Sequence, residues 1–366
     1  MRLTTSLLLL SLSLIFSNIQ TIQFNENGEY TIVQFTDLHF CGSDETDLQT
    51  QELQRNILKW AQPDLVVFSG DAVSGWNAKE PGSFEKCWRK FTEPVVEAQV
   101  PYAYILGNHD AEGEFDREEI VKFDQKNPFS LRTDCDGIPG TSNFVIPLYS
   151  SEDENKLAAN IWLFDTGRDI CEDFHLSWGC LKRYVIDWYN EKSQKIKEEH
   201  GENVHHLAFL HIPIPEYLEL ANTHEIYGNV GEDIGCPYVN NGFFEHVQKN
   251  KDISAMFVGH DHRNNFGGFY RGVELVYGQK SGYATYGDVR GARIITLKEG
   301  YDLEGLPIVT RNHFVMYENG TIGLNEPVRP KEGEKLTNSC AYLGNPIAGQ
   351  IKKIYWNIKK WFWNLA

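Results

Sequence analysis

Short apolar runs recur along the chain, and each run ends in a small polar cluster. The runs are rich in β-branched and aromatic residues, which is typical of buried strands. They predict strands at residues 30–35, 64–68, 102–106, 160–164, 205–210 and 253–258. The clusters that follow read TDLHF, SGD, GNHD, DTG, HIP and GHDH. The pattern therefore predicts buried strands with chemically useful residues just beyond their ends.

Between several of these strands the apolar positions follow helical spacing. Helices are predicted over residues 49–62, 83–98 and 181–200, so strands and helices alternate as in α/β proteins. In open α/β sheets, ligands gather beyond the carboxyl ends of the strands. We therefore expect the polar clusters to meet in space, although they are spread over residues 36–262.

The pattern changes near residue 266, where glycine and tyrosine become frequent and short alternating runs begin. Such runs are typical of antiparallel strands and hairpins. We expect a second, more antiparallel sheet in this region. The chain has no recognisable flexible linker or internal repeat, so a single domain is predicted over residues 28–325.

Composition and charge narrow the class of protein. The chain has 366 residues, of which 41% are hydrophobic and 13% aromatic, which is enough to build a core. Its formal net charge of −17 repels polyanions, so nucleic acid is not an expected partner.

The first residues have the pattern of a secretion signal. A basic start is followed by an apolar run that is too short to span a membrane and then by polar residues. We predict a cleaved signal peptide over residues 1–20 and a secreted or endomembrane-lumenal protein. Asn319 begins an NGT glycosylation sequence, which this route would expose to glycosylation.

Seven cysteines in a secreted chain predict disulfides. Cys171 and Cys180 are close in sequence and form the expected pair. The alternative is that several of the cysteines are small buried hydrophobic residues.

The polar clusters together offer a set of metal ligands. The candidates are Asp37, His39, Asp71, Asn108, His211, His260 and His262. Imidazole combined with carboxylate and amide oxygen suits Fe, Zn or Mn. Residues two apart on an extended strand point the same way, so the D-x-H and H-x-H pairs can each reach one site. A tetrahedral metal ion takes four ligands, and seven candidates are too many for one such ion. The set therefore predicts two ions that share Asp71, whose two carboxylate oxygens can bridge them.

His109 follows the ligand Asn108 but is not needed as a ligand itself. A water bridging the two ions would act as the nucleophile, and His109 is then free to stabilise charge or protonate a leaving oxygen. Asp110, the next residue, is the candidate for orienting the His109 ring.

The ordered set D-x-H, G-D, G-N-H-D, H-x-P and G-H-x-H resembles the calcineurin-like metallophosphoesterase superfamily. The resemblance implies a four-layer α/β/β/α sandwich of the metallo-dependent phosphatase type, with His109 as the catalytic histidine. It implies one ion on Asp37, His39, Asp71 and His262. It implies a second ion on Asp71, Asn108, His211 and His260.

Within that superfamily the segments GTSNFVIPL, FLHIPIPEY, GHDHRNNF and YGQKSGYATYG resemble the purple acid phosphatase-like branch of plants and fungi. True purple acid phosphatases have a tyrosine ligand three residues after the shared aspartate, where this chain has Ser74. The resemblance therefore implies no tyrosinate-to-iron absorption band and leaves the identity of the ions open.

The leading hypothesis is a secreted phosphatase that hydrolyses phosphomonoesters, with Asp71 and His109 as the central catalytic residues. The alternatives are a phosphodiesterase acting on lipid or nucleotide substrates and a catalytically silent binding protein. Arg263, Tyr283 and Tyr286 flank the last cluster and could contact a substrate phosphate, although tyrosines in such a region are often packing residues.

The C-terminal segment 345–366 combines apolar residues at helical spacing with tryptophans and lysines. Such a helix can lie in a membrane interface, which would give the protein a peripheral membrane contact. It can equally dock its apolar face on the protein itself.

Overall fold

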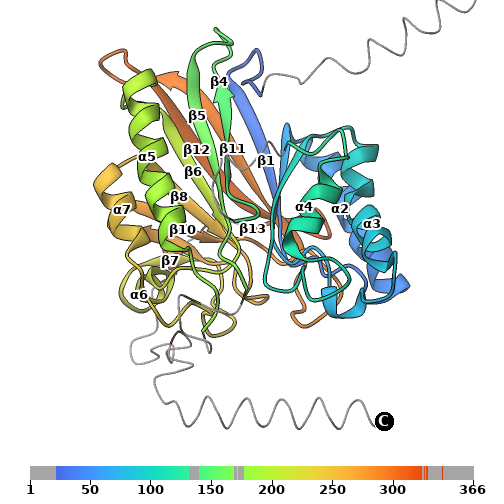
Figure 1. The fold of residues 1–366 in the computed structure, drawn as a ribbon. Helices are drawn as coiled ribbons and strands as arrows, with labels where there is room; N and C mark the ends of the chain where they lie inside the picture. The colour runs from blue at the N-terminus through green and yellow to red at the C-terminus, as the bar shows by residue number, and fades with distance from the viewer. Residues whose placement is uncertain are drawn as a thin grey trace, which may run out of the picture.

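The computed structural model describes residues 22–131, 140–168, 171, 177–323, 325, 327–328 and 340. Two β-sheets pack face to face between two groups of helices (Figure 1). Helices α5 and α7 cover one sheet, and helices α2, α3 and α4 cover the other. The predicted α/β/β/α sandwich is therefore confirmed. The predicted signal peptide 1–20 and the segment 345–366 lie outside the described residues.

The six-stranded sheet has the order β13-β12-β11-β1-β2-β3. Its strands are β1 (Glu29–Phe35), β2 (Leu65–Ser69), β3 (Tyr102–Ile105), β11 (Gly291–Tyr301), β12 (Pro307–Tyr317) and β13 (Ile322–Gly323). Strands β1, β2 and β3 run parallel to one another, and β11 pairs with β1 in the antiparallel sense. The carboxyl ends of the parallel strands therefore lie at one edge.

The eight-stranded sheet has the order β14-β7-β9-β10-β8-β6-β5-β4. Its strands are β4 (Phe144–Tyr149), β5 (Leu157–Phe164), β6 (His205–Leu210), β7 (Ile226–Tyr227), β8 (Ile253–Val258), β9 (Gly267–Tyr270), β10 (Val273–Tyr277) and β14 (Pro327–Val328). Strands β5, β6, β8 and β10 are parallel. All six strands predicted from apolar runs are present within three residues of their expected limits.

The antiparallel strands expected after residue 266 are present, but the expectation that they form a second sheet of their own was wrong. Strands β9 and β10 extend the eight-stranded sheet, whereas β11, β12 and β13 extend the six-stranded one. The edges of β8 and β1 each carry backbone groups that need hydrogen-bond partners, and these later strands satisfy them.

The helices are α2 (Asp44–Ala61), α3 (Ser83–Glu97), α4 (Arg117–Asp124), α5 (Arg183–His200), α6 (Glu216–Thr223) and α7 (Phe243–Asn250), with a 3₁₀ turn η1 (Gly75–Asn77). The three predicted helices are confirmed as α2, α3 and α5. Helix α2 begins earlier than predicted because Ser43 and Thr46 form a capping box. Helices α4, α6 and α7 have eight residues each, which is too short to produce a clear periodic signal.

The strands have apolar residues on both faces because both faces of each sheet are covered. Ile32, Val67 and Phe257 belong to the core between the two sheets and are fully buried. Two further cores lie between each sheet and its helices. This burial explains the nearly continuous apolar runs in the sequence.

Three disulfides link described residues. The expected pair Cys171–Cys180 is confirmed, and Cys41–Cys87 and Cys236–Cys340 are also present. The seventh cysteine, Cys135, lies outside the described residues. In the part of the chain that the structure describes, no helix is both long and apolar enough to cross a membrane.

Candidate metal centre

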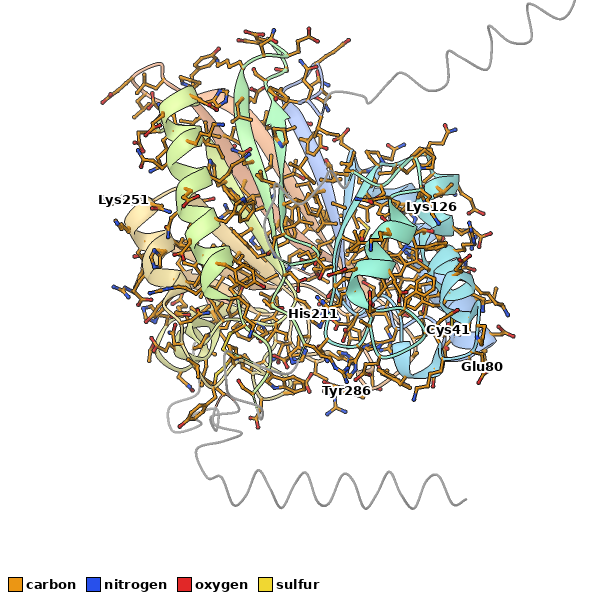
Figure 2. All side chains as sticks on the ribbon, viewed as in Figure 1. Cys41, Glu80, Lys126, His211, Lys251 and Tyr286 are labelled. Carbon is orange, nitrogen blue, oxygen red and sulfur yellow. A yellow bond between two sulfur atoms is a disulfide. The ribbon has the colours of Figure 1, made fainter. Side chains whose placement is uncertain are left out.

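The polar clusters meet at one edge of the sandwich, beyond the carboxyl ends of the parallel strands. In Figure 2, His211 and Tyr286 both lie at the lower end of the molecule, between the two groups of helices. The seven candidate ligands are Asp37, His39, Asp71, Asn108, His211, His260 and His262, and each is no more than 8% exposed. Five segments of the chain, which follow β1, β2, β3, β6 and β8, thus place these side chains at a single edge.

One group of ligand atoms comes from the residues that follow strands β1, β2 and β8. Nε2 of His39 and Nε2 of His262 lie 3.2 Å apart, and Nε2 of His262 lies 3.5 Å from Oδ1 of Asp37. Nε2 of His39 also lies 3.6 Å from Oδ2 of Asp71. These atoms surround a small common space.

A second group lies directly beside the first. Nε2 of His211 is 3.3 Å from Oδ2 of Asp71 and 3.0 Å from Oδ1 of Asn108. The same Asn108 oxygen lies 3.0 Å from Nδ1 of His260. Oδ2 of Asp71 therefore faces both groups, while its Oδ1 accepts a hydrogen bond from the His109 amide at 2.8 Å. We had expected the two oxygens of Asp71 to be divided between the ions, and the structure instead presents one oxygen to both.

The donor atoms have the chemistry and spacing of a metal site. Two sets of three side chains place their donor atoms within 4.8 Å of one another: Asp37, His39 and His262, and Asp37, Asp71 and His211. Without a cation, two buried carboxylates would face several imidazole nitrogens that cannot all donate hydrogen bonds to them. The residues present fit a pair of transition-metal ions.

The backbone at these strand ends is strained in a way that directs side chains inward. Asp37, His39, Asp71 and His260 have positive φ values of 53°, 53°, 52° and 76°. This left-handed conformation is costly for residues other than glycine and tends to occur at functional sites. The strain is maintained here by the buried surroundings of the four residues.

Two glycines permit the close approach of the ligand loops. A Cβ on Gly70, which has a φ of 99°, would lie 2.2 Å from Nδ1 of His211. A Cβ on Gly107 would lie 2.1 Å from Oδ1 of Asp71. The glycines of the SGD and GNHD clusters are therefore required by packing against the ligands.

The role expected for Asp110 was wrong. Its carboxylate accepts hydrogen bonds from the backbone amides of Asp71, Val73 and Gly107, at 3.1, 2.9 and 2.7 Å. Asp110 therefore holds two ligand loops together. The ring of His109 is instead oriented by Glu112, whose Oε2 lies 2.9 Å from Nδ1.

Glu112 also links His109 to an arginine. Its second oxygen, Oε1, accepts a hydrogen bond from Nη2 of Arg168 at 2.7 Å. Glu112 could not be assigned from the sequence, because it follows the GNHD cluster by two residues inside an acidic stretch. The only available signal was its three-residue separation from His109.

The electrostatic environment prepares most of the ligands for a cation. Burial alone would raise the pKa of Asp71. The nearby His211 and His109 have the opposite and larger effect, so the pKa lies well below its usual range. Burial lowers the pKa of His39 well below its usual value and that of His260 to about 3. The carboxylate is therefore ionised and both imidazoles are neutral, which is the form that binds metals.

Two other histidines have raised pKa values. Burial lowers the pKa of His211, but Asp71 and Asp37 outweigh this effect and raise it to about 9. Burial also lowers the pKa of His109, but Asp71 and the hydrogen bond that its ring donates to Glu112 outweigh this effect and raise it above the usual value. Its surroundings thus favour the protonated form of His109 more than those of an ordinary histidine.

Aromatic rings enclose the imidazoles at the rim. The rings of Trp76 and His109 are 4.7 Å apart edge to face, and those of Trp178 and His260 are 4.5 Å apart. The ring of Tyr286 stacks on His262 at 4.2 Å. These contacts fix the orientation of the imidazoles and exclude water from one side of each.

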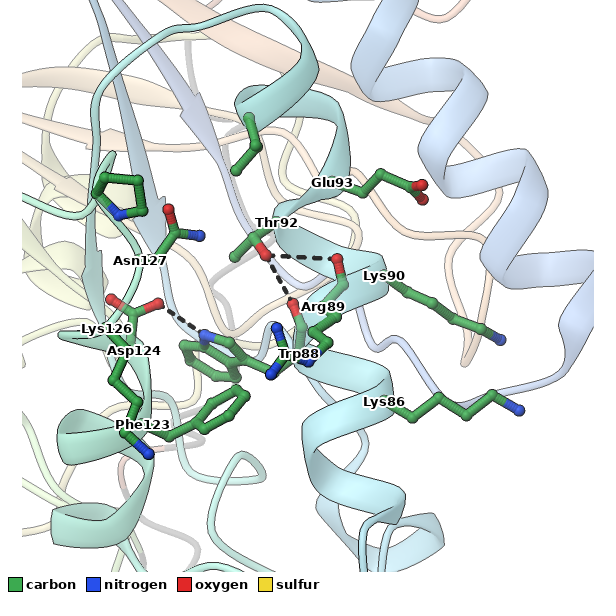
Figure 3. Close-up of a pocket in the computed structure, with 12 residues that line it drawn as sticks. Lys86, Trp88, Arg89, Lys90, Thr92, Glu93, Phe123, Asp124, Lys126 and Asn127 are labelled. Carbon is green, nitrogen blue, oxygen red and sulfur yellow. Dashed lines mark hydrogen bonds between the residues drawn. The ribbon is translucent and has the colours of Figure 1, made fainter. Parts of the chain in front are cut away.

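A separate hollow of about 570 Å³ lies beside helix α3, and none of the candidate ligands lines it (Figure 3). Several of its polar groups bond to neighbouring side chains or to the backbone of their own helix. Nε1 of Trp88 donates to Asp124 at 2.7 Å, and Oγ1 of Thr92 donates to the carbonyl of Trp88 at 3.0 Å. This hollow is accounted for by packing, which leaves the sheet edge as the candidate site.

Comparisons with known proteins agree with this geometry. The chain is 28% identical over 308 residues to "Probable inactive purple acid phosphatase 29" of Arabidopsis thaliana, covering 75% of this chain and 78% of that protein. It is 30% identical over 309 residues to "Probable inactive purple acid phosphatase 14" of the same plant, covering 76% and 77%. A crystal structure of a dimetal phosphatase from Danio rerio aligns with a TM-score of 0.52 and 14% identity over 82% of this chain and 98% of that chain, which supports the fold.

The sequence model of the calcineurin-like phosphoesterase family matches residues 30–264, which contain all seven candidate ligands and His109. The match and the two adjacent ligand groups together indicate a dinuclear metal site in a phosphoester hydrolase fold. The resemblance to the purple acid phosphatase-like branch is likewise confirmed by the Arabidopsis relatives. The chain belongs to the calcineurin-like phosphoesterase family.

Proposed function

We propose that the protein is a secreted, dinuclear metal-dependent phosphatase that hydrolyses phosphomonoesters. The observation that carries this proposal is the pair of buried ligand groups that share Oδ2 of Asp71, with His109 beside them. Three disulfides fit an oxidising compartment and support secretion.

The proposed division of the ligands follows the two groups of contacts. Asp37, His39, Asp71 and His262 would hold one ion. Asp71, Asn108, His211 and His260 would hold the other. When bound, two ions of Fe, Zn or Mn lower the pKa of water and neutralise charge on a phosphate group.

His109 is the proposed general acid. It is a neighbour of Asn108 in sequence, but its ring is hydrogen-bonded to Glu112 and is partly accessible, with 34% of its side chain exposed. A proton on Nε2 would be transferred to the oxygen of the leaving alcohol as the ester bond breaks. Glu112 would hold the ring in the tautomer and orientation that this transfer requires.

A catalytically silent binding protein is the contrasting hypothesis, and the names of the Arabidopsis relatives include the word inactive. This chain nevertheless retains every ligand that the family resemblance implies, and the described structure brings all of them to one edge. A silent protein would have had no reason to keep four residues in strained backbone conformations around a buried polar cluster.

One observation favours a second candidate, a phosphodiesterase acting on lipid head groups. The Cys236–Cys340 disulfide fixes residue 340 close to the metal centre, because the neighbouring Gly235 is packed against His260. The amphipathic sequence 345–366 begins five residues later. If that segment binds a membrane surface, the metal edge would face the lipid head groups.

Metal analysis combined with a substrate panel tests these proposals. The protein would be expressed with its own N-terminus, and its metal content measured by mass spectrometry. We expect about two ions per chain, hydrolysis of p-nitrophenyl phosphate and a mature protein that lacks residues 1–20. Faster hydrolysis of bis(p-nitrophenyl) phosphate, together with sedimentation on vesicles that is lost on deleting 345–366, would favour the second candidate. No bound metal and no activity after adding Mn, Zn or Fe would favour the silent protein.

A further inference from the structure

A pocket of about 620 Å³ adjoins the metal centre, and nothing in the proposed mechanism uses it. His262 lines this pocket and also belongs to the first group of candidate ligands. Arg263 and Arg290 line it as well, together with Tyr317 and Asn319. A ligand bound at the metals could therefore extend past His262 into a space that contains two guanidinium groups.

Arg290 is buried without the partners that a guanidinium normally requires. It is 8% exposed, and its Nε and Nη1 have no hydrogen-bond partner among the described residues. Its Cζ lies 5.2 Å from the centre of the Tyr283 ring. Leaving a charged group buried and unpaired costs free energy that a bound anion would restore.

Three other arginines of the fold are each held by a charged side chain or by backbone carbonyls. Arg293 is completely buried, but its Nε and Nη2 each donate to a backbone carbonyl at 2.7 Å and its Nη1 lies 3.1 Å from His313. Arg311 is paired with Glu274 at 2.5 Å, and Arg117 with Asp165 at 2.5 Å. Nε of Arg311 also has no hydrogen-bond partner, but the Arg311 guanidinium is ion-paired with Glu274. Among the described residues, no carboxylate lies within ion-pair distance of Arg290, and neither its Nε nor its Nη1 has a hydrogen-bond partner.

Arg263 extends the positive region toward the metals. Its Cζ lies 5.5 Å above the ring of Tyr286, and that ring stacks on His262. Asp288 and Glu318 also line the pocket, but both are exposed to solvent, and neither is within ion-pair distance of Arg290 in the described structure. The hydroxyl of Tyr283 donates a hydrogen bond to Glu318. Asp288 and Glu318 are thus at the surface of the pocket, whereas the guanidinium of Arg290 is buried.

We propose that this pocket binds a second phosphate group of the substrate, so that preferred substrates carry two phosphate groups on one small alcohol. One phosphate would be at the metals and the other on Arg290 and Arg263. A guanidinium binds phosphate through two parallel hydrogen bonds, and Nε with one Nη forms such a pair. The chain has a formal net charge of −17, and the two guanidinium groups of this pocket would offset its repulsion of a doubly phosphorylated ligand.

This proposal rests on the proposed function, and equilibrium binding of non-hydrolysable ligands separates the two. The probes are α,ω-bisphosphonates with linkers of two to eight carbons, each compared with the alkylphosphonate of the same length. Binding to the metal-loaded protein would be measured by isothermal titration calorimetry. At one or more linker lengths we expect the bisphosphonate to bind about tenfold or more tightly than its monophosphonate, which is the gain of one charge-assisted contact.

Three variants test whether the tighter binding of the bisphosphonate depends on the two arginines of this pocket. Arg290→Gln should reduce the ratio of the two affinities to about one, and Arg263→Gln should reduce it partly because that side chain is exposed. Arg271→Gln is the matched control, since Arg271 pairs with Glu245 at 3.8 Å away from the pocket and should leave the ratio unchanged. A thermal denaturation curve for each variant would establish that it is folded.

Two results would overturn the subsite: a wild-type ratio near one at every linker length, or a ratio retained in both Arg290→Gln and Arg263→Gln. Hydrolysis of p-nitrophenyl phosphate is measured separately. Activity without a bisphosphonate preference would reject the subsite and keep the phosphatase. A preference without activity would keep the subsite and reject the phosphatase.

Discussion

Nδ1 of His109 lies 2.9 Å from the carboxylate of Glu112, three residues later in the same loop. The other oxygen of Glu112 is bound by Arg168, so the carboxylate is held from both sides. This arrangement leaves Nε2 of His109 as the nitrogen available to a substrate.

Replacing Glu112 tests whether it acts through His109. Glu112→Gln keeps a similar shape but removes the charge that orients and favours the protonated ring. We expect kcat to fall about 10- to 100-fold for alkyl phosphates, and much less for aryl phosphates with good leaving groups, because these need little protonation. Metal content should not change. The exposed Glu80→Gln is the control, and an equal loss for both classes of substrate would contradict the positioning role.

Asp71 and His109 should divide metal binding from proton transfer. Asp71→Asn weakens the one oxygen that faces both ligand groups, so we expect both the metal content and the activity to fall steeply. His109→Ala should retain the metals and reduce kcat by about 10² to 10⁴. Metal content and rate would be measured on the same preparations. Loss of metal in His109→Ala, with a normal rate per bound ion, would show that the roles are assigned wrongly.

Glu274 should make folding sensitive to acid. Burial raises its pKa, but the hydrogen bond from His313 and the charge of Arg311 outweigh this and lower it to about 2. A lowered carboxyl pKa stabilises the fold fully above the unfolded value of 4.5, and this stabilisation is lost as the pH falls toward 2. Glu274→Gln should reduce the free energy of unfolding at pH 7 by about 3 kcal/mol and flatten its pH dependence below 4.5. Urea denaturation at several pH values measures both, and exposed Glu118→Gln should change little.

The Cys41–Cys87 disulfide closes a sequence separation of 46 residues and ties the loop after His39 to helix α3. The loop-closure model predicts that the Cys41→Ser, Cys87→Ser double variant loses about 4 kcal/mol of stability. The Cys171–Cys180 pair closes a separation of 9 residues, and its removal should cost about 3 kcal/mol. Urea denaturation of the two double variants measures both losses of stability. Only the variant that lacks the Cys41–Cys87 disulfide should also loosen the position of His39 and weaken metal binding. An unchanged stability in both would contradict the prediction.

Ser74 occupies the position where true purple acid phosphatases have a tyrosine ligand, and its Oγ lies 3.3 Å from Nδ1 of His39. Protein loaded with iron should therefore lack a tyrosinate-to-iron absorption band in the visible spectrum. A visible band that disappears on reduction of ferric iron would mean that another tyrosine reaches the centre.

The strands, the principal helices and the polar residues that meet at the sheet edge could be predicted from the sequence because each leaves a local signal. Apolar runs of strand length ending in D-x-H, GNHD or GHDH indicate both burial and chemistry, and the order of these clusters indicates the family. Short helices such as α4 left no comparable signal, and the strands after residue 266 could not be assigned to a sheet, because pairing partners are chosen by the edges available in space.

The sequence by itself determined which residues would meet at the sheet edge, since strand ends in a parallel sheet converge whatever the detailed packing. Only the tertiary structure decided which polar groups form hydrogen bonds with one another. It assigned Asp110 to the backbone amides of two loops and Glu112 to His109, because those contacts depend on how the loops fold over one another. Within the described residues it also left Nε and Nη1 of Arg290 without hydrogen-bond partners, in a pocket that His262 lines as well, which is a property that no spacing of residues along the chain can express.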